Sequence, residues 1–249
     1  MWHAKKYGGY QFASQEAIDN ATEVCSYLLS KDYTLEACCA ILGNIGGEGA
    51  LNPWRWEADS VPTVSVFESW TDEEARHHGY GLVGFTPANR YINAQNATAL
   101  DEYGYAPNFE DSIGEPEDGL AQTVFFESEI EHTFSISSPS WALGYYIASF
   151  QQVLGFTMEQ LAEIVDISYN DFKTDDSIPL ENLTGVFELR YEKPRAEVEI
   201  EGTTYYPAAS SYPNRVSIAN YYYQYFQDNP PPGWNPLSKE STWKFYLFI

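Results

Sequence analysis

The stretch from Ala40 to Pro53 reads Ala-Ile-Leu-Gly-Asn-Ile-Gly-Gly-Glu-Gly-Ala-Leu-Asn-Pro, and a second glycine-rich stretch from Gly79 to Pro87 reads Gly-Tyr-Gly-Leu-Val-Gly-Phe-Thr-Pro. The first pattern predicts a helix that runs into a carboxylate flanked by glycines, Glu48. The second predicts a narrow strand lying opposite that carboxylate. Together they indicate a cleft that presents one special acid.

The neighbours of Glu48 suggest a chemical role for it. Gly46, Gly47 and Gly49 remove side chains around the carboxyl group, as glycine does where a backbone turns sharply or approaches a ligand closely. The nearby residues Ile41, Leu42, Ile45 and Leu51 are apolar, and an apolar wall favours the protonated form of a carboxyl group, which suits a general acid. The alternative is a surface glutamate in a flexible loop.

Two helices are expected to lead up to this acid. The first covers residues 14 to 30, with Ser14 as its cap and an apolar stripe that includes Cys25. The second begins at Thr34 and is expected to be stopped by Gly43 or Gly46.

Further elements follow from the hydrophobic periodicity. One helix is expected over 116–132 with Leu120 inward, and another from Ser140 with Ala148 and Val153 inward. A third is expected to begin after the capping box formed by Thr157 and Gln160. The last two are expected over 180–191 and 214–226. A polar break is expected at 171–176, and a small hairpin at 196–207.

Composition limits the classes of function. The 249 residues carry 36 acidic and 13 basic side chains, a formal charge of −23, with 44% hydrophobic and 16% aromatic residues. This is a globular composition, and 249 residues fit one sizeable domain. So negative a chain is repelled by nucleic acid and by anionic membranes. The same charge suits a polycationic glycan.

No metal, cofactor or export signal is expected. The three cysteines (Cys25, Cys38, Cys39) and the adjacent His77 and His78 lack ligand-like spacing, so we expect buried thiols without a disulfide, no metal and no cofactor. The opening Met1 to Tyr10 has no apolar core of a signal peptide, and no apolar run approaches the ~20 residues of a membrane span.

Motifs around both glycine-rich stretches resemble the phage tail lysozyme family. Its members read roughly L-G-N, E-S-G-L-N-P, G-Y-G-L-x-Q-W-T, F-x-x-x-Y-E-x-P and R-x-x-x-A. The matching segments here are Leu42 to Asn44, Glu48 to Pro53, Gly79 to Pro87, Phe187 to Pro194, and Arg215 with Ala219. The resemblance covers about residues 15 to 228, with Gly49 in place of the usual serine and Gly84 in place of the usual glutamine.

The resemblance implies a fold, a reaction and a place of action. The fold is a lysozyme-like α+β domain, mainly helical, with a small β-hairpin region lining the cleft. The reaction is cleavage of the peptidoglycan glycan strand by a glycoside hydrolase with Glu48 as general acid, and the protein is expected in the phage tail of the virion, acting on the host cell wall. A lytic transglycosylase stays an open alternative to a hydrolase.

Candidate partners of Glu48 come from the loops and the late helix. A second carboxylate would lie about 5 to 9.5 Å from the acid, and Asp59 and Glu57 are the first candidates, unless they are solvated loop acids or the substrate's own groups replace them. Tyr80 and Thr86 are expected to face the sugar. Tyr191 and Glu192 match the family's Y-E-x-P, and the alternative for Tyr191 is an ordinary position at a helix end.

The domain is expected to span residues 1–228. Residues 229–249 then form a Pro-rich linker and an apolar tail that could dock to other phage tail proteins. Two rival functions stay open. One is a chitinase or chitosanase sharing the fold, which the negative charge favours, and the other is a glycan-binding structural tail protein without catalysis, which Gly49 and Gly84 favour.

Overall fold

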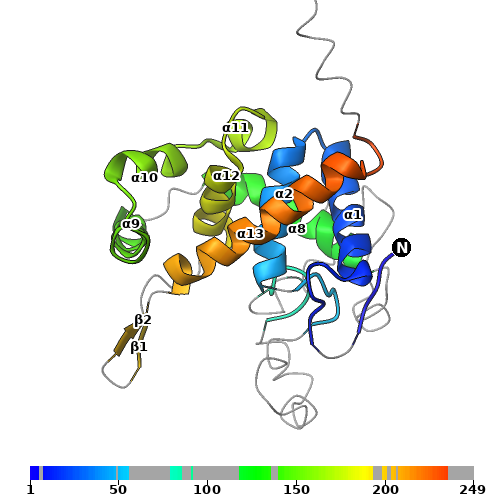
Figure 1. Ribbon diagram of the computed structural model, residues 1–249, viewed down its shortest axis with the longest axis horizontal. Helices are drawn as coiled ribbons and strands as arrows, with labels where there is room; N and C mark the ends of the chain where they lie inside the picture. The colour runs from blue at the N-terminus through cyan, green and yellow to red at the C-terminus, as the bar shows by residue number, and fades with distance from the viewer. Residues whose placement is uncertain are drawn as a thin grey trace, which may run out of the picture.

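The computed structural model describes residues 1–5, 8–48, 50–55, 79–85, 91, 118–135, 140–192, 198–200, 203–205 and 207–234. This part of the chain is mainly helical, as the sequence predicted (Figure 1). Its elements are α1 Gln15–Ser30, α2 Leu35–Glu48, α8 Asp118–Ser135, α9 Ser140–Leu154, α10 Met158–Val165, α11 Tyr169–Thr174, α12 Leu180–Phe187, the π-helical turn η3 Glu188–Glu192, β1 Val198–Ile200, β2 Thr203–Tyr205 and α13 Pro207–Asp228.

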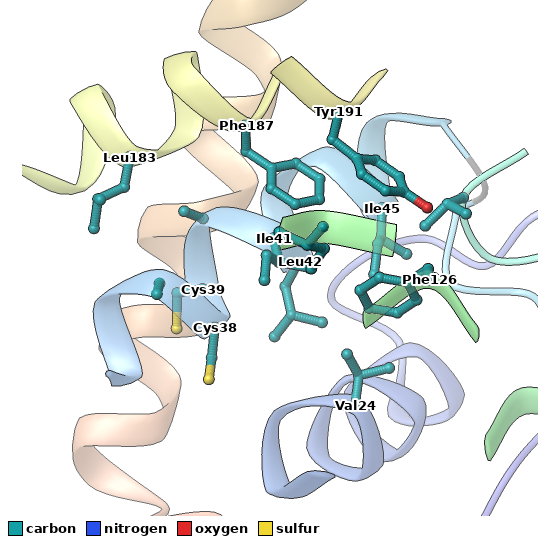
Figure 2. Close-up of a cluster of buried hydrophobic side chains, with 14 of the residues drawn as sticks. Val24, Cys38, Cys39, Ile41, Leu42, Ile45, Phe126, Leu183, Phe187 and Tyr191 are labelled. Atoms are coloured by element: carbon teal, nitrogen blue, oxygen red, sulfur yellow. The ribbon is translucent and has the colours of Figure 1, made fainter. Parts of the chain in front are cut away.

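Helix α2 is the centre of the core. Every residue from Leu35 to Ile45 is buried, which is the pattern of a helix surrounded by others on all sides. Figure 1 shows α2 enclosed by α1, α12 and α13. In Figure 2, Val24 of α1, Phe126 of α8 and Phe187 of α12 point toward its apolar side chains. The three cysteines are buried, unpaired thiols in this core, and burial raises the pKa of Cys38 and Cys39.

The predicted helix starts are confirmed by their caps. The Ser14 hydroxyl accepts from the backbone N–H of Ala17 at 3.3 Å, and the Thr34 hydroxyl accepts from that of Ala37 at 3.1 Å. Thr157 and Gln160 form the full capping box at the start of α10. In each case a side-chain oxygen satisfies an amide that has no partner inside the helix.

The glycines of α2 have a different role from the one predicted. Helix α2 does not stop at Gly43 or Gly46 but continues to Glu48. A Cβ on Gly43 would lie 2.5 Å from the carbonyl oxygen of Arg215 and 2.8 Å from Cβ of Ala219, both in α13. The absence of a side chain therefore lets α13 pack directly on the backbone of α2.

The segment after α2 turns sharply and is tied to the second glycine-rich stretch. Ala50 and Leu51 both have positive φ (47° and 55°), which reverses the chain at once. The buried Gln122 of α8 donates to the carbonyl of Pro53 at 2.7 Å and accepts from the N–H of Leu82 at 2.7 Å. One side chain thus holds both segments together.

In its described residues 79–85, the predicted strand over 79–86 is instead a tight turn. Residues 81–84 form the turn, which is closed by a single antiparallel bridge between Tyr80 and Phe85. Gly81 has φ +83°, and a Cβ there would lie 2.2 Å from Oε1 of Gln122, so the stretch bends around that side chain.

The predicted hairpin at 196–207, which was not expected to line the cleft, is confirmed in its described residues. Strands β1 and β2 pair antiparallel, with Val198 opposite Tyr205. In Figure 1 they lie at the outer edge of the molecule, beyond the start of α13, and not beside the end of α2. The β-region expected to line the cleft is therefore reduced to the turn at 80–85 in the described part of the chain.

Periodicity misplaced some helical faces. Leu120 and Val153, expected inward, are 38% and 42% exposed, and Ala148 is exposed as well. Helix α11 occupies most of the predicted polar break at 171–176, with Ser168 capping it. Within the described ranges, no helix combines the length and apolar character that crossing a membrane requires.

We expect Gly43→Ala to lower the free energy of unfolding by about 1–3 kcal/mol, because the added methyl meets backbone that cannot move aside, and this outweighs the ~1 kcal/mol gain in helix propensity. Gly46→Ala is the matched control, since its Cβ would meet only side-chain atoms of Ile218, the nearest at 2.9 Å. It should cost less in urea denaturation. A Gly43→Ala protein as stable as the wild type would contradict this account.

Candidate active site

Glu48 is the last residue of α2, and its side chain is 38% exposed. It is therefore at a helix end and not in a flexible loop. Its Oε1 forms an ion pair with Nη2 of Arg215, which comes from the middle of α13. The exposed carboxylate thus has a fixed cationic partner behind it.

Arg215 is held in place by Asn44, one helical turn before Glu48. The arginine side chain is only 2% exposed. Its Nη1 donates to Oδ1 of Asn44 at 3.0 Å, and the amide of Asn44 in turn donates to the carbonyl of Thr184 in α12 at 3.1 Å. Gly47 leaves room for the arginine, because a Cβ there would lie 3.0 Å from Arg215 Cγ.

A second glutamate, Glu188, shares the same guanidinium. It is the first residue of η3 and is completely buried. Its Oε1 lies 3.3 Å from Nε of Arg215 and accepts from the hydroxyl of Ser211 at 2.7 Å. Its Oε2 is buried and meets no hydrogen-bond donor among the residues that the structure describes. π-helical turns inside helices often mark functional sites.

The pKa of Glu188 in this cluster is unusually high for a glutamate. Burial, and to a lesser extent the charge of Glu48, raise the pKa of Glu188 to about 7, against the opposing effects of the Arg215 charge and the Ser211 hydrogen bond. One guanidinium therefore compensates two carboxylates, one of them out of contact with water. Such a site can bind a proton near neutral pH.

The arrangement assigns different chemistry to the two acids. Glu48, with over a third of its side chain exposed, can touch a bound ligand and exchange a proton with it. Glu188 has no exposed surface and can act only through Arg215.

Several of the other predicted site residues fall on parts of the chain that the structure does not describe. Asp59, Glu57 and Thr86 lie outside the described residues, and Glu192 is described only as the end of η3. Two of the predicted sugar-contacting residues, Tyr80 and Tyr191, are buried in the core.

Tyr80 and Tyr191 offer little surface to a ligand. Tyr80 is 1% exposed, and its ring stacks on Tyr91 with centroids 6.3 Å apart. Tyr191 is 7% exposed, stacks on Phe187 at 4.9 Å and donates its hydroxyl to Glu129 at 3.3 Å. Neither ring faces an open surface.

Sequence reasoning missed Asn44, Glu188 and Arg215 as parts of the site. Asn44 and Arg215 belong to quoted motifs, but no role was assigned to them. For Glu188 the signal was a charged residue directly between the apolar Phe187 and Leu189 in a predicted helix. A charge at such a position is rarely buried without a partner.

Comparison with known proteins agrees with the motifs. A family model described as phage tail lysozyme matches residues 19–226. The chain is also 34% identical over 86 residues to Morphogenesis protein 1 of Bacillus phage B103, a match that spans 34% of this chain and 20% of that protein. The chain thus corresponds to only a fifth of the length of this curated relative.

The pKa of Glu188 predicts a pH-dependent stability. Its folded value, about 7, lies above the usual 4.5, so the folded state binds the proton more tightly and loses stability as pH rises from about 4.5 to about 7. The loss is on the order of 3 kcal/mol. Glu188→Gln cannot ionise, so its free energy of unfolding should rise relative to the wild type by about that amount between about pH 5 and about pH 8.

Urea denaturation across this pH range checks the prediction. Glu163→Gln, an exposed position on α10, is the matched control and should follow the wild type at every pH. A constant difference between the Glu188→Gln protein and the wild type would show that Glu188 titrates normally.

Proposed function

The chain belongs to the phage tail lysozyme family, and from this we propose that it is a tail-associated glycosidase that cleaves the glycan strand of bacterial peptidoglycan, with Glu48 as general acid. One observation carries the proposal. Residues from three separate family motifs, Asn44, Glu48 and Arg215, meet in space and present one carboxylate at the surface.

Glu48 would protonate the glycosidic oxygen as the bond to the anomeric carbon breaks. It then becomes a carboxylate that Arg215 stabilises through the existing ion pair. Water held by a second carboxylate, for which Asp59 and Glu57 remain our candidates, or a group of the substrate itself completes the attack. Attack by water gives a hydrolase, and attack by a sugar hydroxyl gives a lytic transglycosylase.

The shape of the site supports a polymer substrate. Glu48 lies beside the segment 50–55, which Gln122 fixes against the turn at 80–85. The family's usual glutamine is Gly84 in this turn, and a Cβ there would meet no atom within 4 Å. The surface near this turn therefore has open space where a side chain would otherwise stand. We assign this space to the glycan.

The proposed place of action is the phage tail, where the enzyme opens a local hole in the host wall. The formal charge of −23 would slow free diffusion of the protein toward an anionic wall. A protein attached to a virion does not depend on its own diffusion to reach the wall. Residues 229–249 are our candidate for contact with other tail proteins.

Two rival functions have specific support. The negative charge favours chitosan, a polycationic glycan, as the substrate. Gly84 and Gly49 favour a glycan-binding tail protein without catalysis. Chitosan hydrolysis without wall lysis would establish the first, and wall binding without release of sugar would establish the second.

Glu48→Gln should reduce lysis of purified Gram-positive cell walls by about 10²- to 10⁴-fold, because the amide cannot donate the required proton. The measurement is turbidity loss, followed by mass spectrometry of the soluble fragments. Reducing ends would identify a hydrolase, and 1,6-anhydro ends a transglycosylase.

Glu163→Gln serves again as the matched control, since this exposed glutamate of α10 belongs to no part of the site. It should lyse walls at the wild-type rate. Equal lysis by the Glu48→Gln and wild-type proteins would remove Glu48 from the mechanism, and absence of lysis across several wall types by the wild type would refute the enzymic function.

A further inference from the structure

We propose that Glu188 is a positioning residue for the active-site acid. It shares the Arg215 guanidinium with Glu48, so that the three groups together hold one proton that Glu48 delivers to the substrate. This inference rests on the proposed function, because it explains how a carboxylate in contact with an arginine can still act as an acid.

The contact between Glu48 and Arg215 poses a chemical problem. A guanidinium beside a carboxylate favours its charged form, whereas a general acid must carry a proton before the reaction begins. A simple ion pair would therefore stabilise the product state of Glu48 and oppose its protonation. A second carboxylate on the same guanidinium, when it is ionised, weakens this stabilisation of the Glu48 carboxylate.

The geometry places Glu188 in that competing position. Each nitrogen of the guanidinium group has a recorded partner. Nη2 contacts Glu48 and Nη1 donates to Asn44. Nε donates to the Ser211 hydroxyl at 3.4 Å and lies 3.3 Å from Oε1 of Glu188. Asn44 is itself fixed by its hydrogen bond to Thr184. The guanidinium group therefore forms ion pairs with both carboxylates at the same time.

The balance of charge then favours one bound proton. With both carboxylates ionised, the cluster has a net charge of −1 next to a completely buried group, and uptake of one proton makes it neutral. Ser211 donates to Glu188 and favours its charged form, while burial disfavours it. Because these effects oppose each other, the nearby charge of Glu48 influences how readily Glu188 takes up the proton.

The other ionisable groups facing Glu188 do not disturb this balance. Among the residues that the structure describes they are Tyr212 of α13 and Tyr146 of α9, and the Glu188 charge influences both. Burial raises the pKa of both, that of Tyr146 to about 12, so both phenols are neutral near pH 7. Arg215 and Glu48 are the charged partners that the structure records for Glu188 in the described residues.

The number of protons on the cluster is the same before and after one reaction cycle. Glu48 gives its proton to the glycosidic oxygen as the carbon–oxygen bond breaks, and the cluster becomes negative by one charge. The attacking water or sugar hydroxyl then releases one proton as the new bond to the anomeric carbon forms. That proton returns to the pair of carboxylates and restores the neutral cluster.

The first test measures the coupling without any substrate. Glutamate labelled with ¹³C at Cδ is introduced, the Glu188 signal is identified by its loss in Glu188→Gln, and its titration is followed by NMR. We expect a midpoint near 7 in the wild type. In Glu48→Gln the midpoint should fall by about one pH unit, because the neighbouring charge is gone.

Ser211→Ala is the matched control, and it should shift the Glu188 midpoint in the opposite direction. It removes the hydroxyl that stabilises the charged form of Glu188, so the midpoint should rise. Glu48 is at the surface, and its replacement by glutamine is isosteric, so this variant should fold. A Glu188 midpoint that is the same in Glu48→Gln and wild type would overturn the proposal.

The second test uses the pH profile of wall lysis. Glu188→Gln should move the alkaline limb of the profile to lower pH by about one unit, since the charge of Glu188 then no longer competes with Glu48 for Arg215. Glu188→Asp should restore most of the wild-type limb. A purely structural role would lower the rate evenly at all pH values, and that result would count against the proposal.

The two tests separate the inference from the proposed function. Coupled titration together with a shifted limb supports both. Coupled titration in a protein that cleaves no glycan refutes the enzymic function and leaves the shared proton established. Uncoupled titration in a protein that lyses walls keeps the function and rejects the role of Glu188.

Discussion

The close packing of α13 on α2 is the constraint on which the rest of the structure depends. Gly43 has no side chain and Ala219 has only a methyl group, so the backbones of the two helices lie close together. A Cβ on Gly43 would lie 2.5 Å from a carbonyl oxygen of α13. At this separation the side chain of Arg215 spans from its own helix to the end of α2. The same contact that fills the core therefore sets the position of the charge behind Glu48.

The cluster around Arg215 is costly, and its cost indicates a use. A completely buried carboxylate with one oxygen lacking a donor in the described residues destabilises the fold when it is ionised, and an apolar residue would serve the core better. Proteins often retain such groups at sites where chemistry needs a perturbed pKa. In this cluster Glu188 is completely buried, whereas over a third of the Glu48 side chain is exposed.

Much of the fold could be predicted from the sequence because it depends on local pattern. The caps at Ser14, Thr34 and Thr157 and the buried character of α2 follow from residue types at fixed spacing. The glycines of α2 were misinterpreted because the sequence shows where side chains are absent but not what takes their place. Tyr80 was placed at the cleft by its motif, whereas the turn around Gln122 directs its ring into the core.

The sequence by itself determined the family, the mainly helical fold and the glutamate at the end of the central helix, since each depends on motifs or periodicity within a short segment. Only the tertiary structure decided which groups surround that glutamate. Glu48 and Arg215 are 167 positions apart, and Ser211 and Glu188 are 23 apart on different elements. Their meeting depends on how closely two helices pack, and that distance is set by the summed shape of both surfaces, which no local pattern records.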